Sequence, residues 1–161
     1  CWYALEYSSL DKNLEHKDRY NFSKLENDLR NLVTVPDDTK LTITGFNEIL
    51  ELEIVRLHQV IRNLMSNAIK FNDKEIVKID IDIQKKDNKL FFKITDNGIG
   101  IEEKYYSKIF KSFETINTKD KYNSNGLGLY IVQKAIKHNG GEISVSSVFG
   151  KTTTFEFTWI I

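Results

Sequence analysis

The sequence has almost no cysteine, no long apolar run and no excess of either charge. Cys1 is the single cysteine among 161 residues, which excludes an internal disulfide framework and favours a reducing compartment such as the cytoplasm. No stretch approaches the roughly 20 apolar residues that cross a bilayer, and no segment has the basic, apolar and small-residue order of a signal peptide. We therefore expect a cytoplasmic chain without direct membrane contact, although the parent protein could be membrane-bound.

The charges balance, with 23 lysine and arginine residues against 23 aspartate and glutamate residues. No overall field would draw the chain to nucleic acid, so we expect no nucleic-acid partner. The fractions of hydrophobic (40%) and charged (29%) residues are typical of a folded protein, and 161 residues suit one domain with a short additional segment. Because the chain opens on Cys1 without an initiator methionine, we expect it to be part of a longer protein.

What is present is a succession of helix and strand patterns. Leu25, Leu29 and Leu32 repeat at helical spacing, so we expect a helical tail and then a helix before the break at Pro36. The further expected elements are strands at 41–45 and 49–55, a helix at 56–70, a β-hairpin of 75–84 and 89–96, a short helix at 102–110, a polar loop at 114–125, a helix at 127–138, and strands at 142–148 and 152–160. This order indicates an α+β fold, a two-layer α/β sandwich whose mixed, mostly antiparallel five-stranded sheet carries three main helices on one face.

The expected helix at 56–70 has two distinct faces. Its apolar residues recur every three or four positions and predict the core face: Leu57, Val60, Ile61, Leu64, Met65 and Ala68. Beside them runs a polar stripe of Gln59, Asn63, Asn67 and Lys70. Asparagine carbonyl oxygens are hard ligands suited to Mg²⁺, and a lysine one turn further on can hold a phosphate. On this pattern alone, a solvated helix face is an equally good interpretation.

Two glycine-containing segments follow. DNGIG at 96–100 comes directly after a strand, so Asp96 could accept a hydrogen bond, for example from an exocyclic amine, while the glycines let the backbone approach a flat ligand. Taken alone, a tight Asn-Gly turn is the better interpretation. NGLGL at 125–129 opens a helix whose first N–H groups offer an anion site for phosphate, although Gly-x-Gly alone is a weak signal. The long polar loop before it is typical of a functional or disordered segment.

Together and in this order, these segments resemble the Bergerat-fold ATPase and kinase superfamily, specifically the catalytic and ATP-binding domain of histidine kinases. HQVIRNLMSNAIKF is similar to the asparagine box, DNGIGI to the first glycine box, IFKSF to the phenylalanine box and NGLGLYIV to the second glycine box. The closing strand pair, with GGEISVSS before GKTTTFEFTW, also resembles the family's ending. The resemblance covers roughly residues 20–161 and implies the Bergerat fold.

The resemblance implies a role for each matching residue. Asn67, with Asn63, would coordinate Mg²⁺ that bridges the ATP phosphates, and Lys70 would meet phosphate oxygens, which makes these three the candidate catalytic residues. Asp96 would accept a hydrogen bond from the adenine amino group. The other implied nucleotide contacts are the pocket residues Phe71, Gly98, Gly100, Ile101 and Thr153, the lid anchors Phe110 and Phe113, and the lid residues Gly126, Leu127, Gly128 and Leu129.

One departure from the superfamily pattern bears on the reaction. In the ATPase branch, a glutamate one helical turn before the magnesium asparagine activates water, and here that position is Asn63. Without a general base, attack by water should be slow, and a neutral histidine imidazole becomes the sensible acceptor. Asn63 therefore favours phosphoryl transfer over hydrolysis.

Two further departures lie in the lid. Ser124 and Asn125 precede the glycine where the family usually has a Gly-Thr pair. Thr115 stands where many relatives have an arginine that reaches the γ-phosphate. Lys119 or Lys121 could substitute for that arginine, although solvated loop lysines are an equally good interpretation.

The resemblance also implies partners and a domain division. None of His16, His58 and His138 fits the family's phosphoacceptor motif, so we expect surface or packing roles for them and an acceptor histidine on a helical domain that precedes this chain. Residues 1–20 would be a helical tail or linker from that dimerisation domain, and 21–161 the ATP-binding domain. A response-regulator receiver domain would act downstream, and the parent would be a homodimer while the fragment alone is a monomer.

Two other interpretations stay open. The altered glycine box and Thr115 favour a degenerate nucleotide-binding or scaffold domain without kinase activity, whereas Asn67, Asp96 and Lys70 argue against it. An ATPase or chaperone relative is disfavoured by Asn63.

Overall fold

The computed structural model describes residues 16–111 and 127–161. The helices and strands, with η marking 3-10 helices, are β1 (Asp18–Asn21), η1 (Phe22–Lys24), α2 (Leu25–Leu32), β2 (Lys40–Gly45), β3 (Ile49–Leu52), α3 (Ile54–Lys70), β4 (Lys78–Lys86), β5 (Lys89–Asp96), η2 (Glu103–Tyr105), α4 (Gly128–His138), β6 (Ile143–Val148) and β7 (Thr152–Ile160). No helix among these residues is long and apolar enough to cross a membrane.

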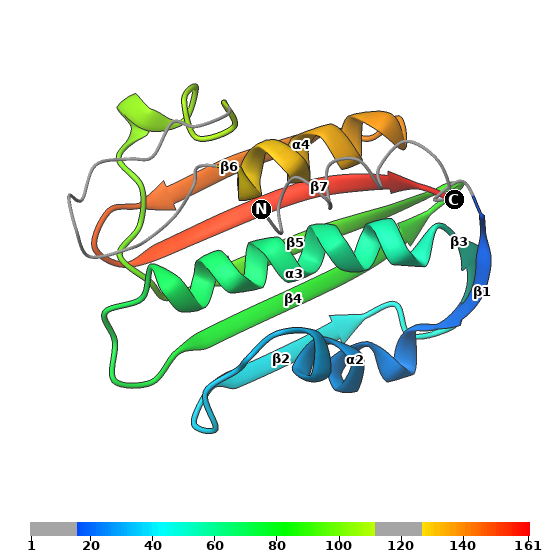
Figure 1. The fold of residues 1–161 in the computed structure, drawn as a ribbon, viewed down its shortest axis with the longest axis horizontal. Coiled ribbons are helices and arrows are strands. Elements are labelled where there is room, and N and C mark those ends of the chain that lie inside the picture. Colours follow the sequence, from blue (N-terminus) through cyan, green and yellow to red (C-terminus); the bar gives the residue numbers. More distant parts are fainter. Residues whose placement is uncertain (1–15, 112–126) are drawn as a thin grey trace.

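The main sheet has five strands in the order β2-β4-β5-β7-β6. β2 runs parallel to β4, and the other neighbouring pairs are antiparallel. Helices α2, α3 and α4 lie over one face of this sheet (Figure 1). The predicted two-layer α+β fold with a mixed, mostly antiparallel five-stranded sheet is therefore confirmed.

The core lies between the helices and the inner face of the sheet. Ile79, Ile81 and Ile83 alternate along β4 and are at most 1% exposed, because successive side chains of a strand point to opposite faces. The apolar stripe predicted for α3 is buried along its whole length. Since each large aliphatic side chain contributes about 1.5–3 kcal/mol on burial, α3 is fixed on the sheet and its polar stripe is held beside the core.

The first residues of α3 are held by an ion pair. Arg56 is 2% exposed, and its Nη1 lies 3.0 Å from Oε2 of Glu53, the residue that precedes the helix. A buried arginine needs such a partner because an uncompensated charge in the interior is strongly destabilising. The ion pair ties the first turn of α3 to the residue that precedes it. The strand expected at 49–55 ends at Leu52, and the helix expected from residue 56 begins at Ile54.

A second, two-stranded sheet of β1 and β3 was not predicted. Residues 18–20 were expected to belong to a helical tail, and they form part of strand β1, which pairs antiparallel with β3. Tyr20 on β1 donates a hydrogen bond to Asp28 on α2 (2.7 Å), and its ring lies edge-on to the His58 ring on α3 (5.1 Å). These non-local contacts outweigh the local helical tendency. The rest of the expected tail, residues 1–15, lies outside the described residues.

The short helix expected at 102–110 is also corrected. The chain forms only the 3-10 helix η2 and further turns, and the Tyr106 hydroxyl donates to the carbonyl of Ser147 on β6 (3.1 Å). This side-chain contact holds the segment against the sheet. The helix predicted at 127–138 is confirmed as α4, and it ends before Gly140, whose φ of +85° suits a helix C-terminus.

Candidate functional site

Three elements end or begin together at the left of Figure 1: α3 ends, β5 ends and β7 begins. The segment that follows β5 is held between its neighbours by backbone hydrogen bonds. The Ile99 N–H donates to the carbonyl of Phe71 (3.0 Å), and the Gly150 N–H donates to the carbonyl of Ile99 (2.7 Å). The segment after Asp96 is therefore fastened to the C-terminal end of α3 on one side and to the β6–β7 turn on the other.

Asp96 is a buried carboxylate at the end of β5, with 8% of its surface exposed. The Gly98 N–H donates to its Oδ1 (2.8 Å), and its neighbour on β7 is Thr153, which is also buried. Burial raises the pKa of Asp96 from 3.8 to about 6, although hydrogen bonds from the backbone of Gly98 and Thr153 favour the charged form.

The raised pKa of Asp96 means that its ionised form lowers the free energy of unfolding. Between these two pKa values the folded chain keeps a proton that the unfolded chain has released, so the contribution of Asp96 to stability falls as pH rises from about 4 to about 6. A shift of this size corresponds to roughly 3 kcal/mol. A buried acid that weakens the fold at neutral pH is typical of a functional site.

Two glycines let the backbone pass close to its neighbours here. A Cβ added at Gly98 would lie 2.4 Å from the carbonyl oxygen of Phe71, and one at Gly100, where φ is +70°, would lie 2.5 Å from the carbonyl oxygen of Val148. Both contacts are with backbone atoms, which cannot give way cheaply. Gly98 and Gly100 therefore set the close approach of the Asp96 loop to α3 and to β6.

We expect Gly98→Ala to destabilise the domain by about 1–3 kcal/mol, because the new methyl group would push the loop away from Phe71. Thermal unfolding measures this loss. Gly128→Ala is the matched control, since a Cβ there would meet no heavy atom of the described residues within 4 Å. Equal melting temperatures for the two variants would contradict the close approach at Gly98.

The polar stripe of α3 ends next to the start of α4. Asn63, Asn67 and Lys70 are half-buried, and burial lowers the pKa of Lys70. α3 packs against α4, and the two helices run in opposite directions, so the C-terminal end of α3 lies beside the N-terminal end of α4 (Figure 1). The end of α3 that carries these polar residues is therefore on the same side of the molecule as the end of α4 that carries unsatisfied N–H groups (Figure 1).

The start of α4 fits an anion. Leu127, at the N-cap, makes no side-chain capping hydrogen bond, and the first turn holds no acidic residue. Among the described residues, the space beside Gly128 is open. Because the N–H groups of a first helical turn carry partial positive charge, this end can receive phosphate oxygens.

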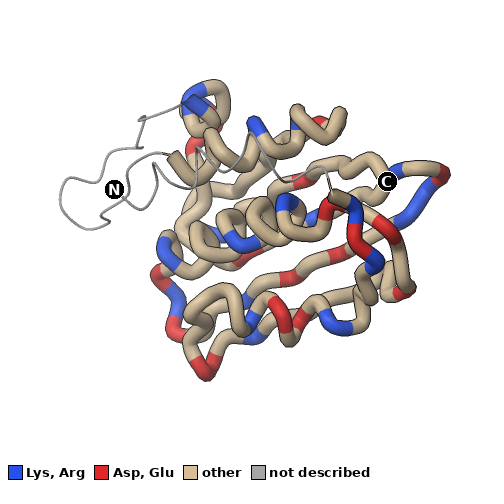
Figure 2. Tube along the Cα trace, turned by 45° about the vertical axis from the view of Figure 1, so that its right-hand side comes forward, with Lys and Arg blue, Asp and Glu red and all other residues tan. Residues whose placement is uncertain are grey.

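The charges of the described chain are otherwise interspersed. Figure 2 shows lysine and arginine alternating with aspartate and glutamate around the molecule. A highly charged ligand would therefore be held by local groups such as Lys70 and the α4 N–H groups rather than by a general field.

Residues 53–160 match the family described as "Histidine kinase-, DNA gyrase B-, and HSP90-like ATPase". The chain belongs to this family. It is 39% identical to Cyanobacterial phytochrome A of Nostoc sp. over 103 residues, 64% of this chain and 14% of that protein. It is 33% identical to Sensor histidine kinase WalK of Bacillus subtilis over 112 residues, 68% of this chain and 18% of that protein.

Among solved structures, the catalytic domain of histidine kinase ThkA matches with a TM-score of 0.65 and 25% identity, covering 89% of this chain and 95% of that chain. The predicted membership of the histidine kinase catalytic and ATP-binding domains is therefore confirmed. The chain spans less than a fifth of the length of the two kinase and phytochrome relatives named above, so it corresponds to one domain of those proteins. Membership in this ATPase family implies that the site receives ATP.

The structure brings five of the predicted site residues together at one end of the sheet. Phe71, Asp96, Gly98, Gly100 and Thr153 meet there through the contacts given above. Ile101, Leu127, Gly128 and Leu129 are half-buried. Phe113, Lys119, Lys121 and Gly126 lie outside the described residues.

Phe110, from the described part of the phenylalanine box, contacts the sheet. The Phe110 ring packs against Phe155 on β7, with ring centroids 6.3 Å apart. The sequence interpretation missed Ser147, whose Oγ accepts a hydrogen bond from the Ile101 N–H (2.8 Å) and donates to the Thr152 carbonyl. The sequence could have indicated this role, because Ser147 is a polar residue at a half-buried position of β6, just before the turn to β7.

Proposed function

We propose that this chain is the ATP-binding catalytic domain of a two-component sensor histidine kinase. It would transfer the γ-phosphoryl group of ATP to a histidine on a helical domain of the same parent protein. The observation that carries this proposal is the position of buried Asp96 beside the end of α3 that bears Asn67 and Lys70. Asp96, the proposed adenine acceptor, and the C-terminal end of α3, the proposed phosphate-binding group, thus lie at the same end of the sheet. The start of α4, which has no side-chain cap, lies next to them.

The residues at the adenine end recognise and enclose the base. Asp96 accepts a hydrogen bond from the exocyclic amine, and its buried position means that an unpaired carboxylate is costly, so a ligand that lacks this donor binds weakly. Thr153 lies next to Asp96 on β7 and closes the slot on the side of the sheet. Phe71, which follows α3, lines the opposite side of the slot.

The residues at the phosphate end bind metal and charge. The described residues contain no cluster of three or more His, Cys, Asp or Glu side chains that could hold a metal ion, so Mg²⁺ would be held by the amide oxygens of Asn67 and Asn63 together with phosphate oxygens. Bound Mg²⁺ supplies neutralisation of the phosphate charge. Lys70 and the first N–H groups of α4 hold phosphate oxygens in place.

Asn63 directs the reaction away from water. An amide cannot serve as a general base, so water bound near the γ-phosphate is not activated from this position. A neutral imidazole supplied by the phosphoacceptor domain is already nucleophilic, and positioning with charge neutralisation then suffices for transfer. A response-regulator receiver domain would take the phosphoryl group next. The parent would dimerise through its helical domain on the cytoplasmic side, and the fragment would be monomeric.

The first test is binding of a non-hydrolysable ATP analogue to the 161-residue chain with and without Mg²⁺. We expect Mg²⁺-dependent binding. The second test gives the full-length parent ATP labelled in the γ-phosphate and identifies the modified residue. Binding without histidine phosphorylation would favour the degenerate scaffold, and rapid release of inorganic phosphate would favour an ATPase.

Adenosine binding should depend on pH through Asp96. Because the pKa of Asp96 is raised to about 6, the charged acceptor is depleted below that pH, and we expect adenosine affinity to fall by up to about tenfold per pH unit below 6. Adenosine is the probe because it has no phosphate, whose own second pKa is also about 6. Calorimetry between pH 5 and 8 measures the profile. The Asp96→Asn variant should show a flat profile, and an unchanged slope in that variant would assign the titration to another group.

A further inference from the structure

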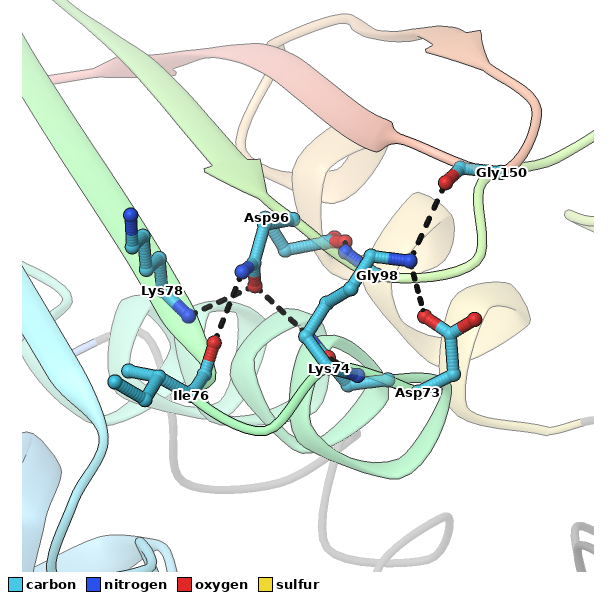
Figure 3. A network of polar contacts seen from close by, with 9 residues as sticks. Asp73, Lys74, Ile76, Lys78, Asp96, Gly98 and Gly150 are labelled. Atoms are coloured by element: carbon cyan, nitrogen blue, oxygen red, sulfur yellow. Dashed lines mark hydrogen bonds and ion pairs between the residues drawn. The ribbon is translucent and has the colours of Figure 1, made fainter.

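Asn97, the residue after β5, is the hub of a hydrogen-bond network. Figure 3 shows this region, with Ile76, Lys78 and Asp96 labelled. Its side-chain Nδ2 donates to the carbonyl of Ile76 (2.9 Å). Its Oδ1 accepts from the backbone N–H of Lys78 (2.8 Å) and from Nδ2 of Asn72 (3.0 Å). One half-buried side chain thus contacts two residues of the connection between α3 and β4 and the first residue of β4. The backbone of Asn97 itself stands between Asp96 and Gly98.

The α3–β4 connection is fastened at further points. Oδ1 of Asn72 accepts from the backbone N–H of Lys74 (2.9 Å), which closes a local turn. Nζ of Lys74 then donates to the carbonyl of Gly150 in the β6–β7 turn (3.3 Å) and pairs with Asp73. The segment that follows Phe71 is therefore held to β5 through Asn97 and to the β6–β7 turn through Lys74.

These contacts join the two halves of the nucleotide site. Asp96 stands on the sheet, whereas Asn67 and Lys70 stand on α3, and these elements are far apart in the sequence. The backbone hydrogen bond between Ile99 and Phe71 joins them directly, and the Asn97 network joins them a second time through the residues just after α3.

We propose that Asn97 is a positioning residue that fixes the spacing between the adenine acceptor Asp96 and the phosphate-binding end of α3. This inference rests on the proposed function, since it assumes that both halves hold one nucleotide. Asparagine is suited to the position because the site needs one donor, for Ile76, and one acceptor, for Lys78 and Asn72. Alanine offers neither, and aspartate offers no donor when ionised.

The proposal predicts which part of the ligand is affected. Loss of the network leaves Asp96 in the sheet with its hydrogen bond from Gly98, so the adenine contact survives. The end of α3 loses the side-chain hydrogen bonds that join it to Asn97, so groups that must meet the phosphates are held less accurately. Because Asn97 is half-buried, water can replace part of the lost bonding, and the Asn97→Ala chain should stay folded.

The test compares adenosine with the Mg²⁺ complex of a non-hydrolysable ATP analogue, each titrated into the 161-residue chain. For Asn97→Ala we expect adenosine affinity within about twofold of the unsubstituted chain and analogue affinity lower by about tenfold. The control is Asn88→Ala, an exposed asparagine in the turn at the other end of β5. It should change neither affinity.

A double-mutant cycle with Lys70→Ala supplies a second measurement. If Asn97 acts by placing the end of α3, the loss of analogue affinity in the double variant should be smaller than the product of the two single losses, because Lys70→Ala removes one of the groups that Asn97 places. Equal losses for adenosine and the analogue, no loss for either, or additive effects in the cycle would overturn the inference while leaving the proposed function standing. Failure of the unsubstituted chain to bind either ligand would overturn both.

Discussion

Alanine in place of Asp96 should abolish measurable adenosine binding, with a loss of about 100-fold or more, while the domain stays folded. A hydrogen bond to a charged group contributes about 1.5–3 kcal/mol, and its loss here leaves the adenine amine buried without an acceptor. Folding should not suffer in proportion, because ionised Asp96 costs stability above pH 6. Isothermal titration calorimetry and thermal unfolding measure the two effects.

The control for this variant is Asp80→Ala. Asp80 lies on β4, in the same sheet, but on the exposed face. It should leave adenosine affinity unchanged. If Asp96→Ala bound adenosine as tightly as Asp80→Ala, the adenine slot would have to lie elsewhere. A melting temperature of Asp96→Ala near or above that of the unsubstituted chain at pH 7.5 would show that function and stability are opposed at this residue.

The elements that could be predicted from the sequence are those whose pattern is long and local. The stripe of α3 and the alternation of β4 are decided by burial of their own apolar residues, such as Leu64 and Ile81, so periodicity was enough to place both. The turn between β4 and β5 was equally predictable, since Asp87 adopts a positive φ of 52° that aspartate tolerates better than most residues.

The elements that could not be predicted are those fixed by distant partners. β1 is a strand because it pairs with β3, and its residues have no alternating apolar pattern of their own. The parallel pairing of β2 with β4 likewise depends on α3 carrying the chain across the sheet. Glu102 to Phe110 contains helix formers, yet it forms η2 and turns, and its Tyr106 contacts the distant residue Ser147 on β6.

The candidate site shows the same division. Asp96, Gly98 and Gly100 stand out in the sequence because their spacing carries a motif. Asn97 stands inside that motif, but an Asn-Gly pair is first of all a turn signal, so its partners 19 and 25 residues away could not be inferred. The role of a residue that joins two segments can be recognised only when the positions of both segments in the structure are known.

Alanine in place of Asn67 should separate the two halves of the site most clearly. Asn67 is half-buried on α3 and is proposed to offer its amide oxygen to Mg²⁺. Its loss should leave adenosine affinity unchanged and remove the gain in affinity that Mg²⁺ gives to the ATP analogue. In the full-length parent, histidine phosphorylation should fall by about 100-fold or more, because charge neutralisation at the transferring group is lost.

Ser66→Ala is the matched control, since Ser66 is the adjacent polar residue on α3 and is exposed to solvent. It should change neither binding nor transfer. If Asn67→Ala kept a Mg²⁺-dependent gain equal to that of Ser66→Ala, the metal would be held by other groups, and Asn63 would be the next residue to replace. Loss of adenosine binding in Asn67→Ala would instead mean that the two halves of the site do not act separately. The paired outcome, adenosine kept and the Mg²⁺ gain lost, is the one that an adenine acceptor on the sheet and a metal ligand on α3 require.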